Sequence, residues 1–265
     1  MTMQQNEFIN EAIAIVDKAQ AFGVTLRVLG ATAFRIHCPE YVEAHIAMNR
    51  VLTDIDFASY SKEEKLVEQF FTKDNFVSDR KQASLTPGLF VGRHIYENPS
   101  TGLHVDIFED ELNMCHKVSF RNRLEVDCPT IPLAEMALEK LQIVTLNEKD
   151  VKDMLMLFAS HPVGDHDKET INGTFIADIM SKDWGFYYTS TVNLGKIRKG
   201  IERYQQYFAA ADLQTIDTHI SQLLQMIEKA PKSIKWKTRA AVGTRVQWYN
   251  DVEEVERADH LSDIK

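Results

Sequence analysis

The sequence predicts an α+β fold, in which a mixed sheet with flanking helices is followed by a helical part. Strand-like and helical patterns are interleaved in the first half of the chain, whereas mostly helical patterns follow Pro132. We expect two domains, over residues 1–128 and 129–265, the second ending in an acidic tail. By composition alone, the polar loop over 161–173 is the best candidate for a boundary.

Apolar spacing and turn residues predict the elements of the first domain in order. These are a helix over 6–22, a buried strand over 26–30 that ends on Gly30, a helix starting at Ala31, an alternating strand over 52–60, a helix over 62–71, and a hairpin of strands over 89–97 and 103–108.

The second domain is expected to be helical. Pro132 suits the first turn of a helix over 132–144, and Asn147 suits the cap of a helix over 147–159. Apolar residues at helical spacing mark two more helices, around 197–208 and 213–227.

The composition is that of a globular protein that builds its own core. The 265 residues are 44% hydrophobic and 26% charged, and no segment reaches the roughly 20 uninterrupted apolar residues of a membrane span. Three cysteines without a CxxC pair suit a reducing compartment. The N-terminal segment is amphipathic with early acids, unlike a leader peptide, so we expect a cytoplasmic protein without a membrane partner.

Charge and cysteine patterns suggest two further sites, both with ordinary structural explanations. The net charge of −9 argues against a surface built wholly for nucleic acid. The stretch over 229–245 nevertheless carries six basic residues, no acid and Trp236, although a solvated connector is the favoured interpretation. His37–Cys38, Cys115–His116 and Cys128 match no compact zinc spacing, so the cysteines are expected to pack as small hydrophobic residues.

The feature that points most clearly to chemistry is a set of three aspartates. Asp54 and Asp56 alternate with apolar residues, so a strand would place both carboxylates on one face. Like charges this close repel unless a cation lies between them, and Mg²⁺ is the usual one. Asp106 also lies between apolar neighbours and is expected to face the same way from an adjacent strand. A bare DxD pair often occurs by chance.

A glycine upstream strengthens the interpretation. Gly30 ends a strand and leads into a helix start, where free N–H groups attract anions and the missing side chain lets a phosphate approach. The order LGATAF, NRVLTDIDF, HVDIF is similar to the nucleotidyltransferase superfamily that includes DNA polymerase beta. Within it, the chain most resembles bacterial and archaeal relatives of the abortive-infection nucleotidyltransferase toxins, over roughly residues 24–195.

The resemblance implies roles for individual residues. Asp54, Asp56 and Asp106 match the metal-binding and catalytic carboxylates of the family. Gly30 matches the first glycine of the Gly-Gly or Gly-Ser turn that holds the triphosphate, but Ala31 replaces its second member.

Six more residues fall at positions that matter in the family. Thr32 is a possible substitute for the missing hydroxyl, with capping or packing as the alternative. Arg50 and Thr53 precede the acidic pair where related toxins carry an Arg and a small polar residue, and Arg50 either steadies a phosphate or forms a salt bridge. Lys140 corresponds to a lysine of the relatives and is a candidate nucleotide contact, while Asp150 and Asp153 share one helix face and also suit its first turns.

The implied function is metal-dependent transfer of a nucleoside monophosphate from a nucleoside triphosphate to a hydroxyl acceptor, with Mg²⁺ or Mn²⁺ as cofactor and release of pyrophosphate. Residues 1–128 would then be the catalytic domain. The acceptor, whether RNA, protein or small molecule, and the oligomeric state stay open. The alternatives are a non-catalytic nucleotide- or partner-binding module, which the Ala31 substitution keeps open, and the toxin of a toxin–antitoxin pair acting on RNA.

Overall fold

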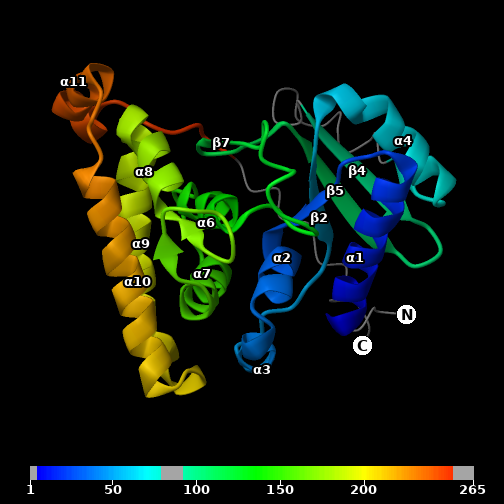
Figure 1. Cartoon of the computed structure of the whole chain (residues 1–265), viewed down its shortest axis with the longest axis horizontal. Helices are drawn as coiled ribbons and strands as arrows, with labels where there is room; N and C mark the ends of the chain where they lie inside the picture. Colours follow the sequence, from blue (N-terminus) through cyan, green and yellow to red (C-terminus); the bar gives the residue numbers. More distant parts are fainter. Residues whose placement is uncertain (1–4, 79–91, 253–265) are drawn as a thin grey trace, which may run out of the picture.

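The fold is α+β, as the sequence predicts. The structure is a computed structural model that describes residues 5–78 and 92–252. Residues 253–265 of the acidic tail expected over 251–265, and the expected strand residues 89–91, therefore lie outside the described residues. Figure 1 shows the mixed sheet with α1 and α4 on one side of the molecule and helices α6–α10 on the other, with α2 between them.

The central sheet has five strands in the order β1-β2-β5-β4-β3. Its strands are β1 (Arg27–Leu29), β2 (Ile55–Ser59), β3 (Val77–Ser78), β4 (Arg93–Asn98) and β5 (Leu103–Glu109). Only the central pair, β2 and β5, is parallel, and the other pairs are antiparallel. The strand predicted over 52–60 is shorter in the structure. Strand β1 ends where the chain turns into α2 at Gly30, so the pairing between β1 and β2 stops at Leu29↔Asp56. Asp54 consequently lies just before the strand.

In the described part of the chain, four α-helices precede or interrupt the strands of this sheet. They are α1 (Gln5–Phe22), α2 (Gly30–His37), α3 (Val42–Ala47) and α4 (Glu64–Lys73). The helix expected over 6–22 is confirmed almost residue for residue, whereas α3 was not expected. Its six residues are too few to show a helical period.

The second half is mostly helical, and two of its helices match the expected ranges closely. Its helices are α6 (Leu133–Leu141), α7 (Glu148–Ser160), α8 (Gly173–Lys182), α9 (Trp184–Tyr204), α10 (Ala210–Lys229) and α11 (Ile234–Val242). Helix α7 begins at the predicted cap, where the Asn147 side chain accepts from the Asp150 N–H. Helix α9 begins well before the expected Ile197, because the Asp183 side chain caps it by accepting from the Phe186 N–H.

Two small ladders were also not expected. An antiparallel pair, β6 (Glu111–Asn113) and β7 (Lys117–Ser119), follows the central sheet, and a parallel pair, β8 (Val163–Gly164) and β9 (Ile171–Asn172), brackets the polar loop after α7. Each strand is two or three residues long, which is too short for an alternating pattern to show.

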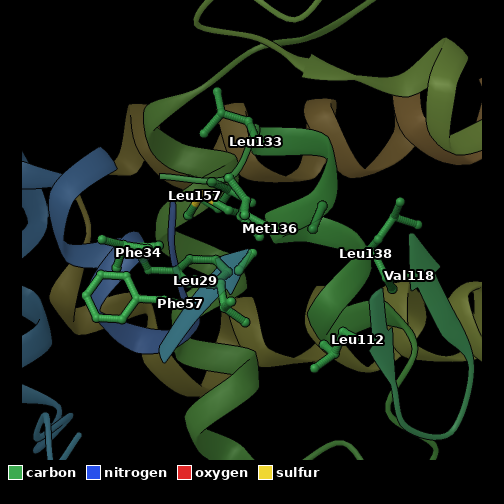
Figure 2. Close-up of a cluster of buried hydrophobic side chains, with 14 of the residues drawn as sticks. Leu29, Phe34, Phe57, Leu112, Val118, Leu133, Met136, Leu138 and Leu157 are labelled. Atoms are coloured by element: carbon green, nitrogen blue, oxygen red, sulfur yellow. The ribbon is translucent and has the colours of Figure 1, made fainter. Parts of the chain in front are cut away.

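The buried side chains of both halves form one continuous hydrophobic cluster. Figure 2 shows its centre, where Leu29 and Phe57 of the sheet and Phe34 of α2 lie beside Met136 of α6 and Leu157 of α7. The chain reaches α6 along the free edge of β1, since the Val28 N–H donates to the Pro129 carbonyl. This contact sets α6 beside α2. Among the described residues, no helix has both the length and the apolar character needed to cross a bilayer.

Candidate functional site

The structure brings the three predicted aspartates together. Asp56 and Asp106 are direct neighbours in the parallel pair β2–β5, and Asp54 precedes β2 by one residue. One carboxylate oxygen from each of the three can be chosen so that all lie within 4.8 Å of one another. Neighbours in register share a sheet face, so the strand pairing places Asp56 and Asp106 side by side.

The surroundings of Asp56 disfavour its negative charge. Burial raises the pKa of Asp56 well above its ordinary value, and the nearby carboxylates of Asp54 and Asp106 raise it further. Arg93 opposes this shift. A hard divalent cation relieves this kind of crowding between carboxylate oxygens. The donor set therefore fits the Mg²⁺ or Mn²⁺ that the resemblance implies, although the metal-binding role stays a prediction.

Gly30 lies against Asp56 in a backbone conformation that other residues rarely adopt. Its φ is +68°, and a Cβ at this position would lie 2.4 Å from Asp56 Oδ2. Leu29, at the N-cap position before α2, makes no side-chain capping hydrogen bond. The positive φ and the close approach together explain the glycine, because the backbone passes the Asp56 carboxylate too closely for any side chain.

Glu139 is a fourth carboxylate at the site, and the sequence reasoning missed it. Its Oε2 accepts from the Gly30 N–H at 3.1 Å, and its Oε1 is buried without a hydrogen-bond partner among the described residues. Burial raises the pKa of Glu139 to about 7, although Lys140 and the Gly30 N–H act in the opposite direction. In the sequence Glu139 is one polar residue of an ordinary amphipathic helix, so only the packing of α6 against α2 reveals its position.

Arg93 is a second residue that sequence reasoning did not single out. It lies two residues before Ile95, the β4 neighbour of Asp106, and its Nη2 is 2.6 Å from Asp106 Oδ2. Residues two apart on a strand share a face, so this alternation was the available signal. The guanidinium neutralises part of the acidic cluster and fixes the Asp106 side chain.

The predicted nucleotide contacts Arg50 and Lys140 belong to a buried ion-pair network. Arg50 binds Asp153 through two hydrogen bonds, of 2.8 and 2.9 Å, and Lys140 Nζ lies 3.1 Å from Asp150 Oδ1 and 3.3 Å from Asp153 Oδ2. Burial lowers the pKa of Lys140, but the two aspartates outweigh it and raise the pKa overall. Both cations are thus committed to carboxylates in this structure. A role for them at the nucleotide stays a prediction.

The network extends to the segment before β2. Arg35 Nη2 donates to the Arg50 carbonyl at 2.6 Å. The negative charge of Asp54 is one of those that favour the protonated Arg50 guanidinium. The network therefore holds the segment before β2 against α7.

Ala31 and Thr32 occupy the first turn of α2. Thr32 is buried, and its hydroxyl lies 3.5 Å from the Asp54 carbonyl. Thr53 donates to Asp54 Oδ1 at 3.2 Å. In this structure the two hydroxyls therefore position the Asp54 segment, and a phosphate contact by Thr32 stays a prediction.

The basic stretch over 229–245 lies in and around α11, which Figure 1 places away from β2 and β5. Lys235 and Arg239 line a pocket of about 530 Å³ together with Trp184, Trp236 and Trp248. Arg239 donates to the carbonyls of Gly243 and Val246, so one of the basic residues clearly has a structural role.

Comparisons with known proteins add little to this geometry. No family model matches the sequence, and no curated protein matches it. Among solved structures, the chain is similar to an antigenic nucleotidyltransferase-like protein from Paracoccidioides brasiliensis, at 11% identity and a TM-score of 0.39, over 88% of this chain and 97% of that one. At those values the likeness identifies neither a family nor an activity.

Proposed function

We propose that this protein is a metal-dependent nucleotidyltransferase that moves a nucleoside monophosphate from a nucleoside triphosphate to a hydroxyl acceptor. The observation that supports the proposal is the convergence of Asp54, Asp56 and Asp106 beside Gly30 at the start of a helix. Carboxylates suit a hard cation, and a helix start at a residue without a side chain suits a phosphate. The two features together fit a metal-bound triphosphate better than either does alone.

The chain supplies groups for the reaction. When bound, Mg²⁺ or Mn²⁺, held by Asp54, Asp56 and Asp106, stabilises the charge of the triphosphate and of its leaving group. Asp106, oriented by Arg93, accepts the proton of the acceptor hydroxyl. The hydroxyl oxygen forms a bond to the α-phosphorus, the bond from that phosphorus to the bridging oxygen breaks, and pyrophosphate leaves.

Glu139 gives the proposed phosphate position a competitor. Its carboxylate already accepts from the Gly30 N–H. A phosphate that uses this donor therefore displaces Glu139 or shares the site with a protonated Glu139.

Two alternative functions would use the same site: a nucleotide- or partner-binding module without turnover, and a toxin whose acceptor is RNA. The basic pocket lined by Lys235 and Arg239 is the feature that favours an RNA acceptor.

To test the proposal, the protein is incubated with Mg²⁺ and each of the four nucleoside triphosphates in turn, labelled at the α-phosphate. The acceptor offered is total RNA, lysate protein or small hydroxylated compounds. We expect covalent transfer of label to one acceptor class by the wild type, and a loss of about 100-fold or more in Asp106→Asn. Asp74→Asn, at an exposed ion pair with Lys18, controls for the change of charge. Nucleotide binding without transfer would favour the non-catalytic module, and transfer unchanged in Asp106→Asn would exclude the mechanism.

A further inference from the structure

A second group of side chains converges away from the aspartates. His37 is the last residue of α2, His161 is the C-cap of α7, and Glu169 lies in the turn between β8 and β9. One ring nitrogen from each histidine and one carboxylate oxygen lie within 4.8 Å of one another. The two imidazole rings meet edge to face with their centroids 5.5 Å apart. Three separate parts of the chain thus present potential metal ligands to one point.

The hydrogen bond made by His161 fixes which of its nitrogens is available. Its Nε2 lies 3.0 Å from the His37 carbonyl, which can only accept, so Nε2 carries the hydrogen and donates. The neutral ring then has a lone pair on Nδ1, and Nδ1 lies 3.9 Å from Glu169 Oε2. Two electron-rich atoms that face each other across this gap are stabilised by a cation between them.

His37 also has hydrogen-bond partners at its Nε2. Its Nε2 is 2.5 Å from the Thr130 hydroxyl and 3.5 Å from the Asp127 carboxylate, which can only accept. Nε2 is therefore the favoured N–H, and Nδ1 has no hydrogen-bond partner among the described residues. Histidines that bind zinc usually donate their other ring N–H to a carbonyl or carboxylate, which fixes the ring and its tautomer.

We propose that His37, His161 and Glu169 form a zinc site. Two imidazole nitrogens and one carboxylate oxygen are a common zinc ligand set, with water in the fourth position, whereas Mg²⁺ prefers oxygen ligands alone. Bond lengths of about 2.0–2.2 Å require the ligand atoms to approach more closely than 4.8 Å. Glu169 can supply this movement because its side chain is 74% exposed.

The site would connect the two halves of the molecule. Helix α2 starts at Gly30 in the aspartate site and ends at His37, while α7 carries Asp150 and Asp153 and ends beside His161. Bound zinc would fix the far ends of both helices and order the turn that carries Glu169. This inference does not depend on the proposed function, because its test measures metal binding and not turnover.

The test uses the full-length chain, stripped of metal by a chelator and kept in excess Mg²⁺ so that the aspartates do not take up the probe. Zn²⁺ is titrated by calorimetry, and Co²⁺ is added in parallel because tetrahedral cobalt absorbs strongly in the visible. We expect one metal ion per chain, and an affinity at least tenfold lower in His161→Ala and in Glu169→Gln. His166→Ala changes an exposed histidine of the same turn that is outside the group, and should bind as the wild type does.

Three results would overturn the site: no stoichiometric binding by the wild type, unchanged affinity in Glu169→Gln, or a cobalt–thiolate band showing that a cysteine is a ligand. If His161→Ala fails to fold, Glu169→Gln still decides, because an exposed side chain can be changed without disturbing the core.

Discussion

At the scale of single residues, Glu139 carries the clearest pH dependence. Its pKa is raised from an ordinary value of 4.5 to about 7, so the folded state holds this proton more tightly than the unfolded state does. The resulting stabilisation is present below pH 4.5 and is lost as the pH rises through about 7. At about 1.4 kcal/mol per pKa unit, the loss is about 3 kcal/mol.

Denaturant unfolding of the wild type and Glu139→Gln over this pH range measures the effect. The difference between their free energies of unfolding should shift by about 3 kcal/mol against the wild type from pH 4.5 to 7.5. A difference that does not change with pH would show that the pKa of Glu139 is the same in the folded and unfolded protein.

Asp153 is the residue on which the buried ion-pair network depends. It accepts both Arg50 hydrogen bonds and lies beside Lys140, so Asp153→Asn leaves two buried cations undercompensated. We expect a loss of about 3 kcal/mol in the free energy of unfolding, measured by urea denaturation. Asp178→Asn removes an exposed ion pair with Lys182 as the control, and should cost less than about 0.5 kcal/mol. Equal losses in the two variants would contradict the account.

At the scale of elements, the start of α2 depends on the close approach of Gly30 to Asp56. In Gly30→Ala the new Cβ would meet Asp56 Oδ2, in addition to the strain of a positive φ. Gly102→Ala is a matched control, because Gly102 has a φ of +72° with nothing within 4 Å of the added Cβ. We expect a strain cost of about 1–2 kcal/mol in the control and a clearly larger loss in Gly30→Ala, by thermal or chemical denaturation. Similar losses would show that Asp56 simply moves aside.

The elements that the sequence predicted best are those with a long period or a clear cap. Helix α1 and the start of α7 at Asn147 were predictable because apolar spacing and capping are local properties. Helix α3 and the small ladders were not, because their segments are too short to show a period. The alternation around Asp54 and Asp56 predicted that they would converge with Asp106, but the contact of Glu139 with Gly30 spans 109 positions and depends on how α6 packs.

At the scale of the whole molecule, the two halves share one core. Helices α6 and α7 cover buried residues of β1, β2 and α2, as Figure 2 shows. A chain that ends at residue 128 would lack this cover and expose the apolar face of α2. We therefore expect it to show no cooperative unfolding transition by circular dichroism, and we expect the full chain to unfold in a single step. A stable, cooperatively folding fragment over 1–128 would instead show that the first half is an independent domain.

The central claim is that Asp54, Asp56 and Asp106 hold a divalent metal together with a nucleoside triphosphate. Titration of Mn²⁺, followed by the paramagnetic resonance signal of the free ion, tests it directly when α,β-methylene analogues of all four triphosphates are present. The account predicts that the wild type retains Mn²⁺ more tightly with at least one of these analogues than without a nucleotide, and that Asp54→Asn and Asp56→Asn weaken this retention at least tenfold. Retention that is unchanged in both variants, or no retention with any nucleotide, would contradict it.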